Sequence, residues 1–510
     1  MNASNNKRIT INMLMLYFRM FIIMGISLFT SRIILKNLGI EDFGIYSVVG
    51  GIVIMLSFLN SSMTSATQRF ISYELGKKDD CQLSRVFSMS VNTHIIIALI
   101  IFLLAETIGL WFLNAKVVIP VDRLYAANAV YQLSLFSFMT TVIGVPYLAL
   151  IISYEKMNIY AYVSIIESVL KLVIVFALLW FSFDKLILYA LLYLLVTFII
   201  WGIYKTYCKI RFSKIKYSFF WDRPLFNKLM NFAGWNLFGN LSLMAMSQGV
   251  NMLLNLFVGP LANAAWAISF QLGNAVSAFS NNVRTAVNPQ IVKSHSRGND
   301  DYMKTLVFES AKYSYFLLLL ITLPILLETE NVLNIWLEDI PAFTILFCQL
   351  ILVNALIQCF DASFGMIFQA IGRIKENQLF SGMTYFLVLP ISYFFLKFNY
   401  EPEIVFYIQI VSTLLVAFVV KIFLLKKIIN ISFSEYSKRL FFPVFKVTSI
   451  AIILPVILRF NLPDGMLRFV IVLFLSVLSV LISVFYLGIK KPIRVKVKTR
   501  LSIEYNKLIN

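Results

Sequence analysis

The sequence predicts an all-α membrane protein that crosses a bilayer many times. Of its 510 residues, 60% are apolar and only 14% are charged, a balance far outside the averages of soluble globular proteins. The apolar residues gather in runs of roughly 20 or more, the length of an α-helix that spans the hydrocarbon core. We identify about fourteen such runs, separated by polar or basic segments.

The runs form two sets of six with a basic segment between them, and an extra pair follows. The first set is 11–35, 44–67, 86–113, 124–152, 159–181 and 186–206. The second set is 231–257, 261–287, 305–327, 343–370, 378–397 and 403–425, and the extra pair is 441–458 and 466–488. The order of the elements therefore predicts two six-helix lobes and two additional helices.

The two sets resemble each other. Segment 37–47 and segment 257–267 occupy matching places between the first two runs of each set, and at this offset Gly39 falls on Gly259 and Tyr46 on Trp266. Sequence identity between the two sets is low, so the shared order of elements is stronger evidence for a repeat than the individual matched residues. Because each half holds an even number of runs, both halves enter from the same side and are predicted to be parallel repeats. Such repeats are typical of transporters.

Basic residues test this arrangement, because Lys and Arg collect in cytoplasmic loops. Most of the 44 basic residues fall at the amino terminus, at the exits of even-numbered helices and in the carboxyl-terminal tail. We therefore expect both termini to be cytoplasmic. The predicted organisation is an N-terminal lobe (1–207), a basic cytoplasmic linker (208–230), a C-terminal lobe (231–430), the extra helix pair (431–489) and a basic cytoplasmic tail (490–510).

The formal net charge of +19 is dispersed over segments that flank the membrane, and no nucleic-acid motif accompanies it. Topology and anionic membrane lipids explain this charge, so we expect no nucleic-acid partner. The four cysteines are scattered without the spacing of a disulfide or metal framework. The chain also has no nucleotide-binding motif, so we expect no cofactor. Any energy then comes from an ion gradient or from downstream consumption of a substrate.

Polar residues follow one face of the first two helices of each lobe. Lipid tolerates few polar side chains, so such faces point into the protein. They either line a cavity or hold neighbouring helices together, and their repeat-equivalent positions favour a cavity. The residues are Asn12, Arg19 and Thr30; Ser57, Asn60, Ser61, Thr64 and Gln68; Asn236, Asn240, Ser247 and Asn251; and Asn274, Ser277, Asn281, Arg284 and Asn288.

Several charges lie inside or near these helices. Arg19 is about two turns from the cytoplasmic end of the first helix, where it either snorkels to the interface or lines the cavity; we favour the cavity. Arg69 and Arg284 lie near cytoplasmic helix ends, where interfacial anchoring is the alternative to ligand binding.

Two acidic positions are candidates for coupling transport to an ion gradient. Glu167 and Lys171 are four residues apart on one helix, in the orientation that favours a salt bridge, and mutual neutralisation is the alternative role. Asp361 lies in the middle of an apolar run with no cation nearby in the sequence. It is the strongest candidate for binding a proton or another cation, and an interhelical salt bridge is the alternative.

Several segments resemble a known family. They are the Arg19-bearing first helix, Asn37-Leu-Gly-Ile-Glu-Asp-Phe-Gly-Ile-Tyr46, Thr67-Gln-Arg-Phe70, Asn288-Pro-Gln290 and Gln369-Ala-Ile-Gly-Arg373. Together they are similar to the Wzx-type O-antigen and capsule flippases of bacteria, members of the multidrug/oligosaccharidyl-lipid/polysaccharide exporter superfamily. The resemblance extends over residues 7–490.

This resemblance implies that the protein moves undecaprenyl-diphosphate-linked oligosaccharides from the cytoplasmic to the periplasmic leaflet of the bacterial inner membrane by alternating access. H⁺ or Na⁺ are the candidate coupling ions, and a polysaccharide polymerase and glycosyltransferases are the candidate protein partners. Lipid II flippases of the superfamily bind the diphosphate through arginines in helices one, two and eight, and Arg19, Arg69 and Arg284 occupy comparable helices here. The amides expected to bind sugar hydroxyls are Gln68, Asn236, Asn240, Asn251 and Asn281.

Two other functions stay open. A multidrug or cation antiporter of the same superfamily would favour an acidic cavity, whereas Arg19 and the extra helix pair favour an anionic lipid whose tail slides along a gap beside those helices. A membrane enzyme, such as a polysaccharide polymerase or an acyltransferase, would carry a large outer loop or an intramembrane histidine. Here the outer loops are short and His94 and His295 lie near cytoplasmic helix ends, so we expect no enzyme.

Overall fold

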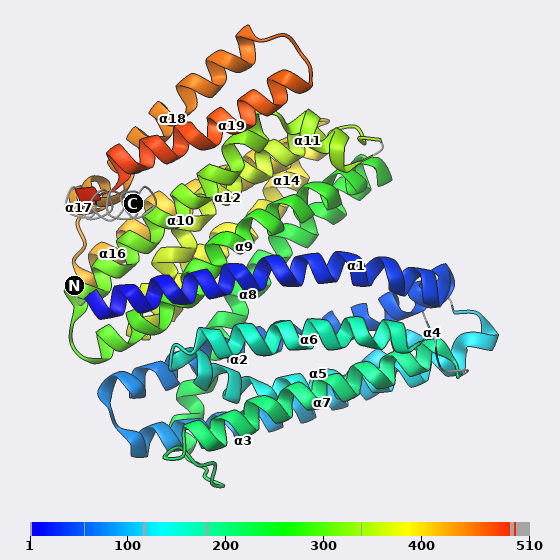
Figure 1. The fold of residues 1–510 in the computed structure, drawn as a ribbon. Coiled ribbons are helices and arrows are strands. Elements are labelled where there is room, and N and C mark those ends of the chain that lie inside the picture. The colour runs from blue at the N-terminus through cyan, green and yellow to red at the C-terminus, as the bar shows by residue number, and fades with distance from the viewer. Residues whose placement is uncertain are drawn as a thin grey trace, which may run out of the picture. The chain divides into compact units, whose positions relative to one another are not determined.

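The structure is a computed structural model that describes residues 3–55, 57–115, 119–178, 180, 183–337, 339–489 and 494–495. For residues 3–7 it describes the backbone alone, and between residues 28 and 59 the backbone and only some of the side chains. Helices make up nearly all of the described residues, among which there is no β-strand (Figure 1). The predicted all-α fold is therefore confirmed. Most of the tail predicted at 490–510 lies outside the described residues.

The helices up to residue 257 come first in the chain. They are α1 (Ala3–Met55), α2 (Ser57–Lys77), α3 (Asp80–Leu104), a π-helical turn (Ala105–Gly109), α4 (Leu110–Ala115), a 3-10 turn (Val121–Arg123), α5 (Leu124–Ser153), α6 (Met157–Ala177), α7 (Lys185–Arg211) and α8 (Arg223–Phe257).

The remaining helices include three further π-helical turns, each continuous with a helix beside it. They are α9 (Pro260–Ser296), α10 (Asp300–Leu327), α11 (Thr329–Trp336), α12 (Thr344–Ile371), α13 (Ile374–Phe386), α14 (Val388–Lys397), α15 (Ile404–Leu415), the turn Val416–Val420, α16 (Lys421–Ile429), α17 (Phe433–Tyr436), the turn Ser437–Phe441, α18 (Phe442–Asn461), α19 (Met466–Ser483) and the turn Val484–Gly488.

The chain forms two compact units, and each is described by itself. Unit 1 consists of Met1–Asn240, Thr285–Met303 and Gln369–Ile374. Unit 2 consists of Leu241–Arg284, Lys304–Phe368 and Lys375–Asn510. Helices α8, α9, α10, α12 and α13 each contribute residues to both units. The division into six-helix lobes that are parallel repeats stays a prediction.

Eleven helical segments of the described residues are long and apolar enough to cross a membrane, so the count of about fourteen is not confirmed. The predicted runs without a counterpart are 44–67, 231–257 and 261–287. The last two lie in α8 and α9, which have 35 and 37 residues and are therefore long enough to span. Their Asn, Ser and Gln residues lower the mean hydropathy. The difference in count thus arises in helices for which a polar face is predicted.

Segment 37–47, predicted as a break between the first two runs, lies inside α1 instead. The segment contains no proline, and a glycine such as Gly39 costs a helix only about 1 kcal/mol relative to alanine. Helical hydrogen bonding therefore continues through it. With 53 residues, α1 contains the whole first predicted run and the beginning of the second.

Helix α5 is the central helix of unit 1. It packs against α1, α2, α3, α6 and α7, and more than half of its residues are buried. Phe87 of α3 meets Tyr147 of α5 edge to face, with ring centroids 5.4 Å apart. Glu155, two residues after the end of α5, is only 3% exposed.

The extra helices α18 and α19 pack against each other in unit 2 and carry large apolar side chains on their outer faces. Phe460, Leu467 and Phe474 are 82%, 75% and 67% exposed. Apolar surface of this extent is unfavourable in water and is the normal lipid-facing surface of a membrane helix.

Candidate functional site

Unit 2 contains a polar cavity of about 220 Å³ between α8, α9, α12 and α15. Two aromatic residues of α9, Trp266 and Phe270, form part of its wall, with their rings stacked 4.7 Å apart. The described residues that line it include no charged side chain. Its polar residues are Ser247, Asn274, Ser277, Asn354, Gln358 and Gln409.

The cavity has unused hydrogen-bonding capacity. Asn354 and Gln358 lie one turn apart on α12, and the side-chain oxygen of Asn354 is buried without a hydrogen-bond partner among the described residues. A buried carbonyl oxygen without a donor costs roughly 1–3 kcal/mol, so a ligand hydroxyl that donates to it gains that energy. Amides beside an aromatic wall suit a neutral, hydroxyl-rich ligand.

A glycine lets two of the cavity helices approach closely. A Cβ atom at Gly273 of α9 would lie 2.4 Å from the Cγ2 atom of Ile351 on α12, well inside van der Waals contact. The absence of a side chain at Gly273 therefore sets the spacing of α9 and α12 at the cavity.

The predicted polar faces divide into two groups. Ser247, Asn274 and Ser277 line the cavity. Asn251 and Asn240 instead hold helices together. Asn251 Oδ1 accepts a hydrogen bond of 2.6 Å from Asn263, and Asn240 Nδ2 donates to the hydroxyls of Ser61 and Ser62 at 3.2 and 3.1 Å.

The other predicted amides differ in exposure. Asn236 is buried in unit 1, whereas Asn281 of unit 2 is exposed. Gln68 is half-buried on α2, and its backbone carbonyl accepts a hydrogen bond of 3.3 Å from the hydroxyl of Ser153. Sugar binding by these residues stays a prediction.

The three predicted diphosphate ligands share one property. Within the described part of the chain, Arg19, Arg69 and Arg284 form no salt bridge, unlike Arg8 and Arg123. Arg19 lies over the ring of Tyr160, 4.4 Å from its centroid, and its Nε atom is buried without a hydrogen-bond partner among the described residues. Its positive charge is therefore not neutralised by a neighbouring carboxylate.

Arg69 uses part of its guanidinium to cap a helix. Its Nε and Nη2 atoms donate to the backbone carbonyls of Gln369 and Ala370 at 3.1 and 3.3 Å, in the last turn of α12. A cation favours this end of a helix, where carbonyl groups are left without partners. Gly372 follows at φ +84°, and a Cβ atom there would lie 2.8 Å from Arg69 Nη2. The contact therefore requires glycine at this position.

Asp361 is part of a buried polar cluster in unit 2. Its Oδ1 atom lies 2.7 Å from Lys421 Nζ, and its Oδ2 atom accepts a hydrogen bond of 2.7 Å from the hydroxyl of Tyr385. Lys421, 1% exposed on α16, also donates to Asn377. Arg284 is close enough for its charge to interact with that of Asp361. A cation from a distant part of the sequence thus lies beside Asp361, as the alternative of an interhelical salt bridge predicts, and a role of Asp361 in ion coupling stays a prediction.

Glu167 and Lys171 form the predicted salt bridge on α6, with 2.6 Å between Oε1 and Nζ. Lys171 also lies 4.6 Å from the ring centroid of Tyr193. The pair is partly exposed, at 36% for Glu167 and 29% for Lys171. A role of this pair in ion coupling stays a prediction.

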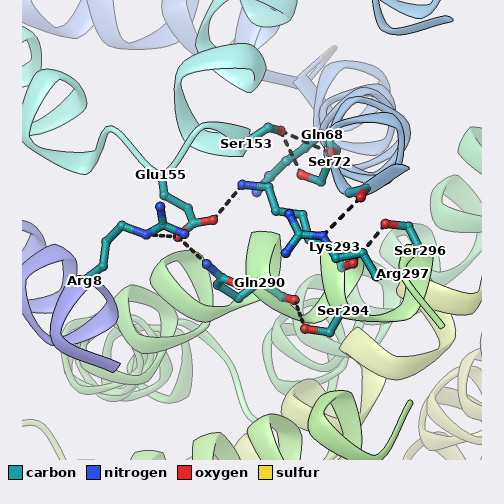
Figure 2. Close-up of polar contacts among 11 residues, drawn as sticks. Arg8, Gln68, Ser72, Ser153, Glu155, Gln290, Lys293, Ser294, Ser296 and Arg297 are labelled. Atoms are coloured by element: carbon teal, nitrogen blue, oxygen red, sulfur yellow. Dashed lines mark hydrogen bonds and ion pairs between the residues drawn. The ribbon is translucent and has the colours of Figure 1, made fainter. Parts of the chain in front are cut away.

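Unit 1 contains a buried cluster around Glu155 that the sequence does not reveal (Figure 2). The side chain of Glu155, directly after α5, has no exposed surface. Its Oε1 atom lies 2.6 Å from Lys293 Nζ, and its Oε2 atom lies 2.7 Å from Arg8 Nε and accepts a hydrogen bond of 2.8 Å from Gln290. Figure 2 shows these donors approaching one carboxylate from α1 and α9.

Burial and backbone conformation show how strongly this cluster is constrained. Glu155 has φ +60°, a left-handed conformation that is unfavourable for a residue with a side chain. Burial lowers the pKa of Lys293, and this effect exceeds the opposing attraction of Glu155. The cost of the conformation and of the buried charges is offset by the hydrogen bonds and ion pairs that Glu155 accepts.

Further contacts attach the end of α9 to α2. Arg297 Nε donates to the carbonyl of Gly76 at 3.1 Å, and a Cβ atom at Gly76 would lie 1.6 Å from Ser296 Oγ. Segments 285–303 and 369–374, which come late in the sequence, thus both contact α2 in unit 1, and segment 285–303 also contacts Glu155 after α5.

The sequence model of the polysaccharide biosynthesis protein family matches residues 9–295, more than half of the chain. The chain belongs to this family. The family resemblance drawn from the sequence is therefore confirmed. The matched range begins one residue after Arg8 and contains both Glu155 and Lys293. None of the curated proteins compared with the chain matches it.

This member of the polysaccharide biosynthesis family has the fold of MATE proteins. A MATE protein in the straight conformation aligns with a TM-score of 0.71 at 14% identity, over 82% of this chain and 95% of that one. The outward-facing conformation of a multidrug resistance MATE transporter of the MOP superfamily aligns with a TM-score of 0.69 at 14% identity, over 81% of this chain and 94% of that one.

A third similar structure is a MOP superfamily transporter from Pyrococcus furiosus, described as having a binding pocket of reverse polarity that suggests a different function. It aligns with a TM-score of 0.68 at 14% identity, over 81% of this chain and 94% of that one. These likenesses establish the fold of this family member.

Two groups of residues are not predicted from the sequence. Asn354 and Gln358 are polar residues one turn apart in an apolar run, and this polar face of α12 is the signal in the sequence that indicates them. Glu155 lies in a short polar segment between two apolar runs, and the sequence contains many such segments. Only Gln290, in the segment Asn288-Pro-Gln290, carried any signal, as part of the family resemblance.

Proposed function

We propose that this protein moves undecaprenyl-diphosphate-linked oligosaccharide units from the cytoplasmic to the periplasmic leaflet of the bacterial inner membrane, for the assembly of O-antigen or capsule. Membership of the polysaccharide biosynthesis family, combined with a transporter fold, is the observation that carries this proposal. Glycosyltransferases would supply the substrate, and a polysaccharide polymerase would consume it.

The cavity of unit 2 supports an oligosaccharide as cargo. It offers amide and hydroxyl groups and an aromatic wall, and its described lining has no charge. Sugars expose hydroxyl groups that exchange hydrogen bonds with Asn, Gln and Ser, so these side chains replace water around the sugar. A volume of about 220 Å³ accommodates one or two sugar rings rather than a whole repeat unit.

The arginines without salt bridges support a diphosphate in the substrate. Transfer of a diphosphate into hydrocarbon without partners would cost many kcal/mol. Guanidinium groups bind phosphate oxygens through charge-assisted hydrogen bonds and remove most of that cost. Arg19 is the strongest candidate, because its Nε atom is buried and has no partner among the described residues.

An apolar groove in unit 2 supports a polyprenyl tail. A cavity of about 270 Å³ lies between α10, α12, the end of α15 with the turn that follows it, and the beginning of α18 with the turn that precedes it. Its wall includes Phe360, Phe418, Phe441 and Phe445, and Thr448 and Tyr315 supply its few polar atoms. The groove thus lies beside the extra helix pair, where the sequence predicts a gap for the lipid tail. A long isoprenoid chain would fill such a groove without any polar partner.

Alternating access requires contacts at the cytoplasmic helix ends to form and break. The cluster of Arg8, Glu155, Gln290 and Lys293 is our candidate, because it binds segment 285–303 to α1 and α5 through charged groups that water can also solvate. In this proposal the cluster is intact when the cytoplasmic side is closed, and it separates when that side opens.

The test is a flipping assay in proteoliposomes that contain a fluorescent undecaprenyl-diphosphate trisaccharide. A membrane-impermeant quencher added outside reports lipid in the outer leaflet. We expect the protein to accelerate its appearance, and the cavity variant Asn354→Leu/Gln358→Leu to reduce the rate at least tenfold. Tyr407→Leu, on the exposed surface of α15, is the matched control. Absence of flipping by the wild-type protein would disprove the proposal.

The fold also favours a second candidate, because a structure it resembles is described as a multidrug resistance transporter. A transporter of cationic drugs needs acidic groups in its binding cavity, and none lines the described cavity of unit 2. Ethidium efflux from loaded proteoliposomes distinguishes the candidates. Efflux driven by a proton or sodium gradient, without flipping of the lipid-linked trisaccharide, would support the antiporter instead.

A further inference from the structure

A second cavity, which the transport proposal does not use, lies in unit 1 at the end of α7. It has a volume of about 440 Å³ and lies between α3, α5, the last turns of α7 and the chain that follows. Its lining combines apolar and aromatic residues with three lysines. The lining residues are Phe87, Tyr147, Leu150, Lys205, Cys208, Lys209, Ser213, Ile215, Lys216 and Tyr217.

The floor of this cavity belongs to the hydrophobic core. Phe87, Leu150 and Ile215 are only 3%, 1% and 6% exposed, and they belong to the same buried cluster as the residues between α3, α5 and α7. The rings of Phe87 and Tyr147 meet edge to face there. The floor is therefore a fixed apolar surface rather than a gap beneath a loose loop.

Hydrogen bonds to α3 fix the outer wall. The hydroxyl of Tyr217 donates to Asn92 Oδ1 at 2.9 Å, and Asn92 Nδ2 donates to the carbonyl of Phe220 at 2.8 Å. The backbone N–H of Ser218 donates to Ser88 Oγ at 3.2 Å. The segment that carries Lys216 is therefore held in place, and its lysine stays beside those of α7.

The rim is positively charged, and its charge is not neutralised. Lys209 and Lys216 are exposed and form no salt bridge in the part of the chain that the structure describes. Lys205 lies 4.6 Å from the ring centroid of Trp201, a contact that holds its ammonium group without cancelling the charge. The neighbouring Asp80 is paired with Lys214 at 3.4 Å. Three cations thus surround an apolar floor.

Exposed aromatic and apolar side chains surround this rim. Ile210, Phe219 and Trp221 are 75%, 84% and 47% exposed. Aromatic rings beside lysines are typical of a segment at the level of the lipid headgroups, where a ring contacts acyl chains and water at the same time. Basic pockets between transmembrane helices bind anionic headgroups.

We propose that this cavity binds an anionic phospholipid of the surrounding leaflet. Lys205, Lys209 and Lys216 contact the phosphate, and the glycerol and the first part of an acyl chain lie on the floor formed by Phe87, Leu150 and Ile215. A free phosphate ion would leave this floor exposed to water, so an amphiphile fits the cavity better than an ion. The site is independent of the transported substrate, and its occupation fixes the basic linker at the membrane surface.

Native mass spectrometry of the purified full-length protein tests this proposal. The probes are phosphatidylglycerol and phosphatidylcholine with identical acyl chains, which differ in net charge. We expect tighter binding of phosphatidylglycerol, weakened roughly fivefold for each lysine replaced, since a lysine near an anionic surface contributes about 1 kcal/mol. The test variant is Lys209→Gln/Lys216→Gln. The control, Lys426→Gln/Lys427→Gln, removes two exposed lysines from the end of α16.

Three results would overturn the proposal. One is equal loss of phosphatidylglycerol binding in the test and control variants, which indicates a nonspecific charge effect. Another is equal competition by inorganic diphosphate, which identifies an ion site without a lipid. The third is displacement of phosphatidylglycerol by undecaprenyl phosphate at equimolar concentration, which identifies a substrate site. Because these readouts measure binding alone, they remain informative even if the protein fails to flip lipid-linked sugars.

Discussion

Glu155 in unit 1 and Asp361 in unit 2 are both carboxylates held by a buried lysine, yet their surroundings differ. Glu155 lies just beyond a helix end and has two cations, Arg8 and Lys293, of which Arg8 is 48% exposed. Asp361 lies in the middle of α12, pairs with Lys421, accepts a hydrogen bond from Tyr385 and lies within range of the charge of Arg284. The comparison indicates that Glu155 is a connector, because its partner Arg8 is exposed to water, whereas Asp361 belongs to a closed ion pair whose lysine side chain is only 2% exposed.

The largest expected effect is that of Asp361→Asn. The change leaves the ammonium group of Lys421 buried without a counter-ion, and breaking a buried pair in this way costs about 3–5 kcal/mol. We expect a marked fall in thermal stability in detergent, and a substantial recovery in Asp361→Asn/Lys421→Met, which removes both charges.

The same variant tests ion coupling. Flipping in liposomes is measured with and without an imposed proton or sodium gradient. If Asp361→Asn retains wild-type stability but loses its response to the gradient, Asp361 is a coupling residue and our description of it as a closed ion pair is wrong.

Glu155→Gln should destabilise less, by about 2–4 kcal/mol, because Arg8 can turn to solvent and only Lys293 is stranded. Hydrogen–deuterium exchange should increase within 285–303 and near the end of α5. The charge exchange Glu155→Lys/Lys293→Glu should restore part of the protection of these backbone amides against exchange.

Asp80→Asn is the matched control for Glu155→Gln, since it removes one partner of an exposed pair, Asp80 and Lys214, in the same unit. Such pairs contribute about 0–1 kcal/mol. Equal exchange in the two variants would show that Glu155 does not hold segment 285–303.

Arg19→Ala should alter stability by only about 1 kcal/mol, the contribution of its contact with the ring of Tyr160. Its effect on transport should be much larger, with lipid-linked units accumulating on the cytoplasmic side and surface polysaccharide reduced. Arg19→Lys should rescue in part, because the charge remains while the fork of donors is lost. Normal polymer from the alanine variant at equal protein level would exclude Arg19 from substrate binding.

The smallest effect is expected for Glu167→Gln. An i, i+4 pair on a helix surface contributes only about 0.2–0.5 kcal/mol, and Glu167 and Lys171 are about one third exposed. Thermal unfolding should therefore be nearly unchanged. A loss of thermal stability as large as that of Asp361→Asn would mean that exposure does not distinguish weak, partly exposed ion pairs from strong, buried ones.

The sequence predicts the helical fold well, because apolar runs and their basic flanks follow directly from the physics of a bilayer. It also locates part of the cavity, since Ser247, Asn274 and Ser277 stand on polar faces in otherwise apolar helices. The sequence does not predict which distant side chains pair with each other. Glu155 and Lys293 are 138 positions apart, and nothing local indicates which distant helix end each one meets.

Hydropathy is also a poor guide where a helix faces a polar interior. The polar residues that mark α8 and α9 as candidate cavity helices are the ones that remove them from a count of membrane spans. Segment 37–47 shows the opposite error, because glycine and polar residues suggested a break where hydrogen bonding continues.

The position of Glu155 along the chain has a consequence for biosynthesis. At about 5–20 residues per second, Lys293 leaves the ribosome roughly 7–28 seconds after Glu155, which precedes it by 138 residues. During that interval the carboxylate of Glu155 lacks its lysine partner. Arg8 precedes Glu155 by 147 residues, so it is already present and can neutralise the carboxylate. Arg8 thus serves as a first counter-ion for Glu155 until α9 is complete.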